Sequence, residues 1–151
     1  MQRLLRALLV VLAIALSSSA GTGCTGIDTS GNSKADEIDY ALRDGPVLVE
    51  FGAAWCGWCG EQQPVIESLS RNITGVTFIS VDVDVNASLA DEYYVEGVPQ
   101  MNLIVKKNDD GSYVYVDRSG RSTTDRFRSR LVGFMEYDEL KPLVEAALAV
   151  R

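Results

Sequence analysis

The sequence contains no histidine among its 151 residues. This absence excludes histidine-based acid–base catalysis and the ordinary catalytic zinc sites, in which imidazole is a ligand. Positive charge is also scarce, because 14 lysine and arginine residues face 21 aspartate and glutamate residues, for a formal net charge of −7. An acidic chain lacks the basic footprint of a nucleic-acid-binding protein, so we expect no nucleic-acid partner.

Cysteine is rare too, with three residues at Cys24, Cys56 and Cys59. Three cysteines cannot build the network of several disulfides that staples many small secreted domains. The apolar and charged fractions are ordinary for a soluble globular protein. Residues 34–151 suffice for one compact domain with its own core, and no internal repeat divides them. We therefore expect a single domain over residues 34–151, present as a monomer.

The first 23 residues have the features of a signal peptide. Arg3 and Arg6 precede an unbroken apolar run over residues 7–16, and small and polar residues follow it. This order of charge, apolar run and small residues is typical of a secretory signal. The run is shorter than the roughly 20 residues that span a bilayer, although an uncleaved anchor helix stays an alternative.

Two cleavage sites compete after this run. Ser18-Ser19-Ala20 fits the site at which a secretory signal is removed, which would release a soluble protein. Gly21-Thr22-Gly23-Cys24 resembles a lipoprotein lipobox, in which Cys24 is lipidated and becomes the new N-terminus. Residues 24–33 predict a flexible polar linker suited to a tether. We favour export with a lipid anchor at the outer face of the cytoplasmic membrane over secretion.

From Lys34 onward, patterns typical of helices alternate with patterns typical of strands. Four helices are predicted: over residues 34–43, from the cysteine motif to about residue 71, from residue 86 or 88 to about residue 94, and over residues 137–149. Ser33 is the expected N-cap of the first helix, and Asn86 or Ser88 that of the third. Strands are predicted over residues 47–51, 76–83, 100–106, 113–116 and 130–132. Residues 117–129 are expected to be irregular. This order indicates the α/β class, with a mixed central sheet flanked by helices on both faces.

The segment Trp55-Cys56-Gly57-Trp58-Cys59 carries the strongest chemical signal, since it follows a predicted buried strand and opens a helix. Two cysteines three residues apart at a helix start lie on one face, close enough to bridge. The unpaired N–H groups and the helix dipole favour a thiolate at Cys56, the attacking form of cysteine. Cys59 is more shielded and suited to resolving a mixed disulfide, while Gly57 allows the tight start.

Other functions of this cysteine pair stay open at this point. Half of a zinc ribbon has the same spacing, but a structural zinc site needs four ligands and the chain has no second pair. Two thiolates also suit Cu(I), so a soft-metal-binding module is an alternative to redox chemistry. A purely structural disulfide across so short a loop would stabilise little. A non-catalytic adaptor is a further alternative.

Residues from about 35 to 148 resemble the thioredoxin family, and VLVEFGAAWCGWC is the densest match. Pro64 resembles the proline of the family's active-site helix, and Gly133 resembles the glycine after its last strand. The resemblance implies a thioredoxin fold and protein-disulfide oxidoreductase activity. It also implies disulfide or dithiol protein substrates, a separate electron donor or acceptor, and no cofactor besides a redox-active Cys56–Cys59 disulfide.

Glu50 interrupts an apolar strand in which an isolated carboxylate is costly and tends to stay protonated. Its place six residues before Cys56 matches the buried acid of the family, which is usually aspartate. We therefore predict that Glu50 has a raised pKa and accepts the proton of Cys59; the alternative is a strand-edge side chain that reaches solvent. Ser80 stands where many relatives carry a lysine, which leaves Glu50 less compensated.

The resemblance also implies a substrate-binding surface around the motif. Pro99 would be the cis-proline that faces the cysteines, and the Val98 backbone would pair with the substrate chain. Trp55 matches the active-site tryptophan and offers an apolar docking face. Gly57 and Trp58 complete this set, and Trp58 stands where typical thioredoxins carry proline, so the redox potential is left open.

Five arginines gather in an otherwise acidic chain, between the predicted hairpin and the last strand: Arg118, Arg121, Arg126, Arg128 and Arg130. The segment looks like an insertion relative to the family. We expect a solvated loop, with docking to an acidic partner or a membrane surface as the alternative.

For the domain itself we favour the reductive direction, in which Cys56 attacks a substrate disulfide, with an extracytoplasmic thiol oxidase as the alternative.

Overall fold

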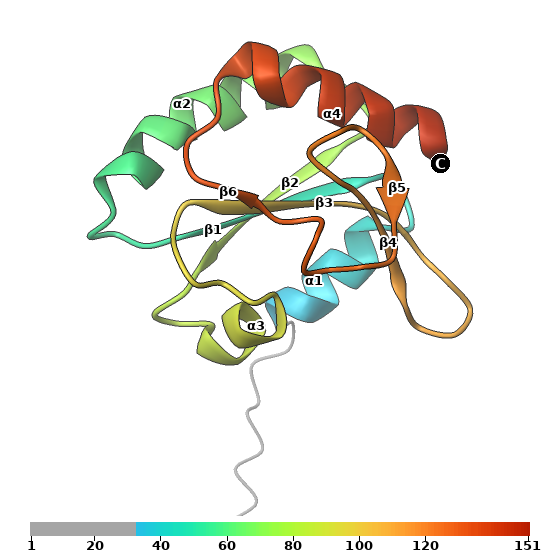
Figure 1. Ribbon diagram of the computed structural model, residues 1–151, viewed down its shortest axis with the longest axis horizontal. Coiled ribbons are helices and arrows are strands. Elements are labelled where there is room, and N and C mark those ends of the chain that lie inside the picture. The colour runs from blue at the N-terminus through green and yellow to red at the C-terminus, as the bar shows by residue number, and fades with distance from the viewer. Residues whose placement is uncertain (1–32) are drawn as a thin grey trace, which may run out of the picture.

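The computed structural model describes residues 33–151 (Figure 1). The predicted signal peptide, Cys24 and all of the predicted linker except Ser33 lie outside the described residues and stay predictions. Within residues 33–151, no helix combines the length and the apolar character that crossing a bilayer requires.

A six-stranded mixed sheet forms the centre of the fold. Its strands are β1 (Val47–Gly52), β2 (Thr77–Asp82), β3 (Gln100–Lys107), β4 (Tyr113–Val116), β5 (Ser122–Thr123) and β6 (Leu131–Val132). The order is β2-β1-β3-β4-β5, with β6 paired to β3 as well. Only β1 and β2 run parallel, and the remaining pairs are antiparallel. The predicted mixed sheet is confirmed.

Helices cover both faces of this sheet, as predicted. They are α1 (Lys34–Ala41), α2 (Gly57–Asn72), α3 (Ala87–Glu92) and α4 (Tyr137–Val150). In Figure 1, α2 and α4 lie over one face, and α1 and α3 lie under the other. Each pair of helices encloses its own cluster of buried apolar side chains.

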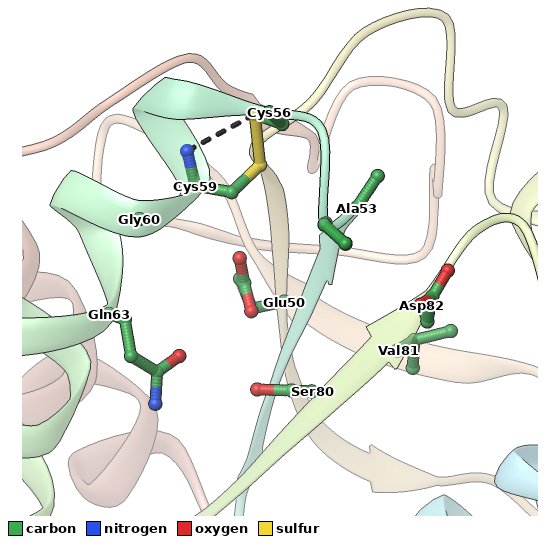
Figure 2. A pocket seen from close by; sticks show the side chains of 11 residues that line it. Glu50, Ala53, Cys56, Cys59, Gly60, Gln63, Ser80, Val81 and Asp82 are labelled. Carbon is green, nitrogen blue, oxygen red and sulfur yellow. Dashed lines mark hydrogen bonds between the residues drawn. A yellow bond between two sulfur atoms is a disulfide. The ribbon is translucent and has the colours of Figure 1, made fainter.

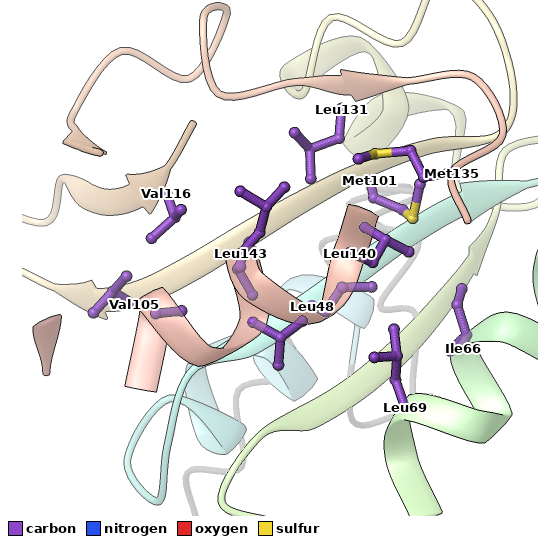
Figure 3. Packing of buried hydrophobic residues seen from close by; sticks show 13 residues of the cluster. Leu48, Ile66, Leu69, Met101, Val105, Val116, Leu131, Met135, Leu140 and Leu143 are labelled. Carbon is purple, nitrogen blue, oxygen red and sulfur yellow. The ribbon is translucent and has the colours of Figure 1, made fainter. Parts of the chain in front are cut away.

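The alternation of side chains along β1 divides these two cores. Leu48 points toward α2 and α4, where it packs with Leu69 and Leu140 (Figure 3). Val49 and Phe51 point the other way, into the cluster beneath the sheet. Glu50 has the same parity as Leu48, so its carboxylate lies on the face that α2 covers.

Two local predictions need correction. Asn86 occupies the N-cap position of α3, but its side chain donates to the carbonyl oxygen of Asp82 at 3.0 Å and does not cap the helix; Ser88 lies inside the helix. Residues 117–129 are not wholly irregular, because Ser122 and Thr123 pair with β4 as the short strand β5. The Ser33 cap is confirmed, since its hydroxyl accepts the N–H of Asp36 at 3.2 Å.

The arginine segment is bound to the domain more firmly than a solvated loop would be. The guanidinium of Arg126 lies 4.5 Å from the centre of the Tyr93 ring and donates to the Tyr115 hydroxyl and to Glu92 Oε1, both at 2.6 Å. Arg130 donates to the carbonyl oxygen of Tyr94 at 2.7 Å. The prediction of a solvated run is therefore wrong for these two arginines. Docking to an acidic partner or a membrane stays a prediction.

We expect Arg126→Ala to lower the free energy of unfolding by about 2–3 kcal/mol, because it leaves polar partners unpaired and removes a cation–π contact. Arg121 is the matched control, since its side chain is 81% exposed. Arg121→Ala should change stability by less than about 0.5 kcal/mol. Urea unfolding of both variants checks this, and equal losses would contradict the role assigned to Arg126.

Candidate active site

Cys56 and Cys59 form a disulfide at the start of α2, with their Cα atoms 5.3 Å apart. Cys56 is the N-cap residue, with extended backbone, and its Sγ accepts the backbone N–H of Cys59 at 3.1 Å (Figure 2). Cys59 is buried, whereas Cys56 is half-buried. A second molecule therefore reaches the sulfur of Cys56 first.

The environment of Cys56 favours negative charge on its sulfur once the disulfide is reduced. The sulfur lies at the positive end of the 16-residue helix α2, and the Cys59 N–H points at it. A thiolate gains from both the dipole and this charge-assisted hydrogen bond, while the neutral thiol gains much less. The predicted asymmetry between an attacking and a shielded cysteine is thus present in the geometry.

Opposite the disulfide lies the predicted cis-proline. The Val98–Pro99 peptide bond is cis, and the Sγ of Cys56 lies 3.5 Å from the carbonyl oxygen of Val98. Pro99 is buried, and its carbonyl oxygen accepts the N–H of Gly133 at 2.9 Å. Gly133 has φ of +90°, a conformation that favours glycine. These contacts fix the backbone of Val98 beside the reactive sulfur.

Glu50 lies in the central strand β1 with only 5% of its surface exposed. It is paired with Ser80 on β2 and Met101 on β3. Burial raises the pKa of Glu50, and a hydrogen bond with Ser80 offsets this only in part. The predicted buried acid is confirmed as a buried group; the alternative of a solvent-reaching side chain is wrong, because both neighbouring strands and α2 enclose it.

The Glu50 carboxylate and the Cys59 sulfur face a common space above Gly52. A Cβ placed on Gly52 would lie 2.9 Å from Glu50 Oε1 and 3.5 Å from Cys59 Sγ. This space belongs to a cavity of about 380 Å³ that continues past Ser80 to Asp82, both exposed residues (Figure 2). The cavity therefore provides room for water between the acid, the inner sulfur and the solvent.

Two exposed tryptophans flank the disulfide, with 70% of Trp55 and 65% of Trp58 accessible. The indole N–H of Trp55 donates to Asp84 at 2.9 Å, which orients its ring. Trp58 packs against Phe134, with ring centres 5.9 Å apart. So much exposed aromatic surface beside a reactive group is typical of an interaction site.

Sequence reasoning missed the support of this surface. The fully buried Gln62 of α2 accepts the N–H of Met135 at 2.8 Å and donates to its carbonyl oxygen at 3.1 Å. This double contact fixes the adjacent Phe134 next to Trp58. The only signal in the sequence is a polar residue on the apolar face of a helix, which does not reveal its partner.

The structure brings together all the predicted site residues that it describes. Cys56, Cys59 and Glu50 line one cavity, and Val98 and Pro99 lie opposite. The role given to Gly57 needs correction. A Cβ at Gly57 would meet nothing within 4 Å and its backbone has no positive φ, so a side chain would fit there.

The family model named Thioredoxin matches residues 31–131. Thioredoxin of Chlamydia pneumoniae is 32% identical over 75 residues, which are 50% of this chain and 74% of that protein. Protein disulfide-isomerase A3 of Gallus gallus is 34% identical over 128 residues, which are 83% of this chain but only 24% of that protein. This chain thus spans about a quarter of the length of that relative.

Solved structures agree with the sequence matches. A mutant thioredoxin of Halobacterium salinarum NRC-1 has a TM-score of 0.57 and 31% identity, covering 78% of this chain and 87% of its own. Thioredoxin of Trichomonas vaginalis has a TM-score of 0.58 and 28% identity, covering 76% and 90%. The predicted fold is confirmed.

The raised pKa of Glu50 predicts a pH-dependent stability. Its pKa in the folded protein exceeds 4.5, the ordinary value expected in the unfolded chain. Between these two values folding takes up a proton, so the free energy of unfolding falls as the pH rises through that window. Glu50→Gln keeps the shape and removes the buried charge. We expect it to be more stable than the parent at neutral pH, with the advantage shrinking as the pH falls toward 4.5.

Urea unfolding at a series of pH values measures this difference. Glu61→Gln, at an exposed position on α2, is the control for removing one carboxylate from the chain. An advantage of Glu50→Gln that stays constant from acidic to neutral pH would contradict the burial of a charge at this site.

Proposed function

The chain belongs to the thioredoxin family, and from this we propose that it is a thiol–disulfide oxidoreductase acting on protein substrates through Cys56 and Cys59. The observation that carries the proposal is the setting of the Cys56 sulfur. It accepts a helix N-terminal N–H, lies beside the cis Val98–Pro99 bond, and is more accessible than Cys59. A sulfur in this setting is both ionised easily and reachable by a second protein.

In the reductive direction the Cys56 thiolate attacks one sulfur of a substrate disulfide. A bond forms between Cys56 and that sulfur, and the other substrate sulfur leaves as a thiolate that takes a proton from water. The thiol of Cys59 then gives its proton to the Glu50 carboxylate and attacks Cys56. The S–S bond between Cys56 and the substrate breaks, and the substrate sulfur that was bound to Cys56 leaves as a thiolate that takes a proton from water. The Cys56–Cys59 disulfide forms, Glu50 returns its proton to water, and two electrons have passed to the substrate.

The backbone of Val98 supports this proposal as a docking element. Within residues 33–151, neither its N–H nor its carbonyl oxygen takes part in a backbone hydrogen bond. An extended substrate segment could therefore pair with Val98 as an added strand, and this would align its sulfur with Cys56. A separate dithiol protein would restore the Cys56–Cys59 dithiol after each turnover.

The roles of the two cysteines predict different behaviour of their serine variants. Cys59→Ser should accumulate a mixed disulfide between Cys56 and a disulfide-containing protein, because the resolving thiol is missing. Cys56→Ser should form no such adduct at a comparable rate, because Cys59 is buried. Non-reducing electrophoresis and mass spectrometry of the adduct check both. Equal adduct formation by the two variants would overturn the assignment.

The redox potential of the Cys56–Cys59 pair decides the direction of electron flow. Titration of the Cys56–Cys59 pair against a glutathione buffer tests it, since reducing thioredoxins have potentials of about −270 mV and strong oxidants about −120 mV. We expect a value on the reducing side. A value near the oxidising limit would instead support an oxidase, which runs the same steps in reverse.

Glu50 serves in this proposal as the proton acceptor of Cys59. The shared space above Gly52 supports this role, because a water there would contact both groups. Only the carboxylate form accepts a proton, so the rate of mixed-disulfide resolution should rise as the pH passes the raised pKa of Glu50. We expect Glu50→Gln to slow resolution by on the order of 100-fold and to lose this pH dependence. Stopped-flow decay of the mixed disulfide measures it, and an unchanged pH profile would refute the role.

A further inference from the structure

A second depression lies beside the cysteine motif and shares no lining residue with the cavity of Glu50. It has a volume of about 780 Å³ and lies between the start of α2 and the segment that leads into α4. It is lined by Gly57, Trp58, Glu61, Phe134 and Glu136. We refer to it as the aromatic–acidic cleft. The proton transfer described above uses none of its side chains.

The aromatic part of the cleft is rigidly supported. Trp58 follows Cys56 by two residues, and its ring meets that of Phe134 at 5.9 Å and 38°. Gln62 holds Met135 by two hydrogen bonds, and Pro99 holds Gly133 by one, so both neighbours of Phe134 are fixed. A preorganised apolar surface binds a side chain at a lower entropic cost than a mobile one.

The acidic part of the cleft has no internal countercharge. Within the described chain, neither Glu61 nor Glu136 takes part in an ion pair. The sequence from residue 47 to residue 105 contains eight carboxylates and a single basic residue, Arg71. Arg71 lies in the last turn of α2, the end remote from the cysteines, where it pairs with Glu67. Arg126 and Arg130, from outside this stretch, pair with Glu92 and Glu96. Among the described residues, the negative charge of the cleft therefore stays without a countercharge.

We propose that the aromatic–acidic cleft selects substrates whose reacting disulfide is flanked by an aromatic side chain and a lysine or arginine. This inference rests on the proposed function and names its substrate class. The aromatic side chain packs on Trp58 and Phe134, and the cation lies between Glu61 and Glu136, where it also meets the face of an aromatic ring. The negative field accelerates the approach of such a segment and repels acidic ones.

The same charges argue against two other occupants. An anionic membrane surface would be repelled by Glu61 and Glu136, as would a nucleic acid. A second copy of this acidic chain would bring carboxylates against carboxylates. A basic polypeptide segment is the occupant that the charge of the cleft favours.

The test compares three peptides that contain one intramolecular disulfide and differ only in the flanking pair Trp-Arg, Trp-Ser or Trp-Glu. The full-length chain is reduced with dithiothreitol and freed of it, and the second-order rate constant of peptide reduction is measured. At low ionic strength the Trp-Arg peptide should react at least about tenfold faster than the Trp-Glu peptide. This ratio should approach one in about 1 M salt, where the Debye length is roughly 3 Å.

Charge-removing variants locate the effect. Glu61→Gln and Glu136→Gln should each slow reduction of the Trp-Arg peptide by about threefold and speed reduction of the Trp-Glu peptide by about as much, the effect of one charge roughly 6 Å away in water. Each variant should therefore lower the Trp-Arg to Trp-Glu ratio by about tenfold. Asp109→Asn is the matched control, because this exposed residue lies in the turn after β3, at the opposite end of that strand from Pro99, and should leave the ratio unchanged. A fourth peptide, with the flanking pair Ala-Arg, tests the aromatic contact: Phe134→Ala should slow reduction of the Trp-Arg peptide more than reduction of this Ala-Arg peptide.

The outcomes separate this inference from the proposed function. One outcome is that the parent protein reduces the small neutral hydroxyethyl disulfide and yet reduces the three peptides with equal rate constants. This result would overturn the assignment of the cleft and leave the proposed function standing. A ratio that Asp109→Asn lowers as much as Glu61→Gln would overturn it too, because net charge would then be the cause. Failure of the reduced parent to reduce hydroxyethyl disulfide would overturn the proposed function itself.

Discussion

The hydrogen bond from the Cys59 N–H to the Cys56 sulfur is the contact around which the site is arranged. It requires β1 to end just before the motif, so that Cys56 keeps an extended backbone while Cys59 enters the first turn of α2. The same arrangement makes one sulfur accessible and the other buried. It also places Cys59 over the strand that carries Glu50, and therefore the acid and the inner sulfur face one cavity without any contribution from a distant loop.

How much of this was visible in the sequence depends on how local each feature is. The motif, its helix and the buried strand before them follow from residues a few positions apart, and they were predicted correctly. The contact of Gln62 with Met135 joins residues 73 positions apart, and no periodic pattern connects them. Phe134 was missed for the same reason. Asn86 was predicted as a cap because the sequence does not show that the carbonyl oxygen of Asp82 lies within its reach.

The polar segment after β4 contributes to the site from outside the motif. Arg126 and Arg130 donate to the carbonyl oxygens of Glu92 and Tyr94, just before the segment that presents Val98. Tyr94 has φ of 53°, an uncommon conformation for a residue with a side chain, and Phe127 packs edge-on against its ring. An insertion that looks like a loop in the sequence therefore braces the backbone that faces Cys56.

Gly52 and Glu50 point to the same face of β1, because they are two residues apart on one strand. Glutamate carries one methylene more than the aspartate usual in the family, and its carboxylate extends toward the place that a Gly52 side chain would fill. The two positions are thus sterically interdependent, because a side chain at Gly52 would push the Glu50 carboxylate out of the space that it shares with Cys59. The backbone of Gly52 has no positive φ, so its conformation alone would allow any residue at this position. The restriction on residue 52 comes instead from the side chain of Glu50.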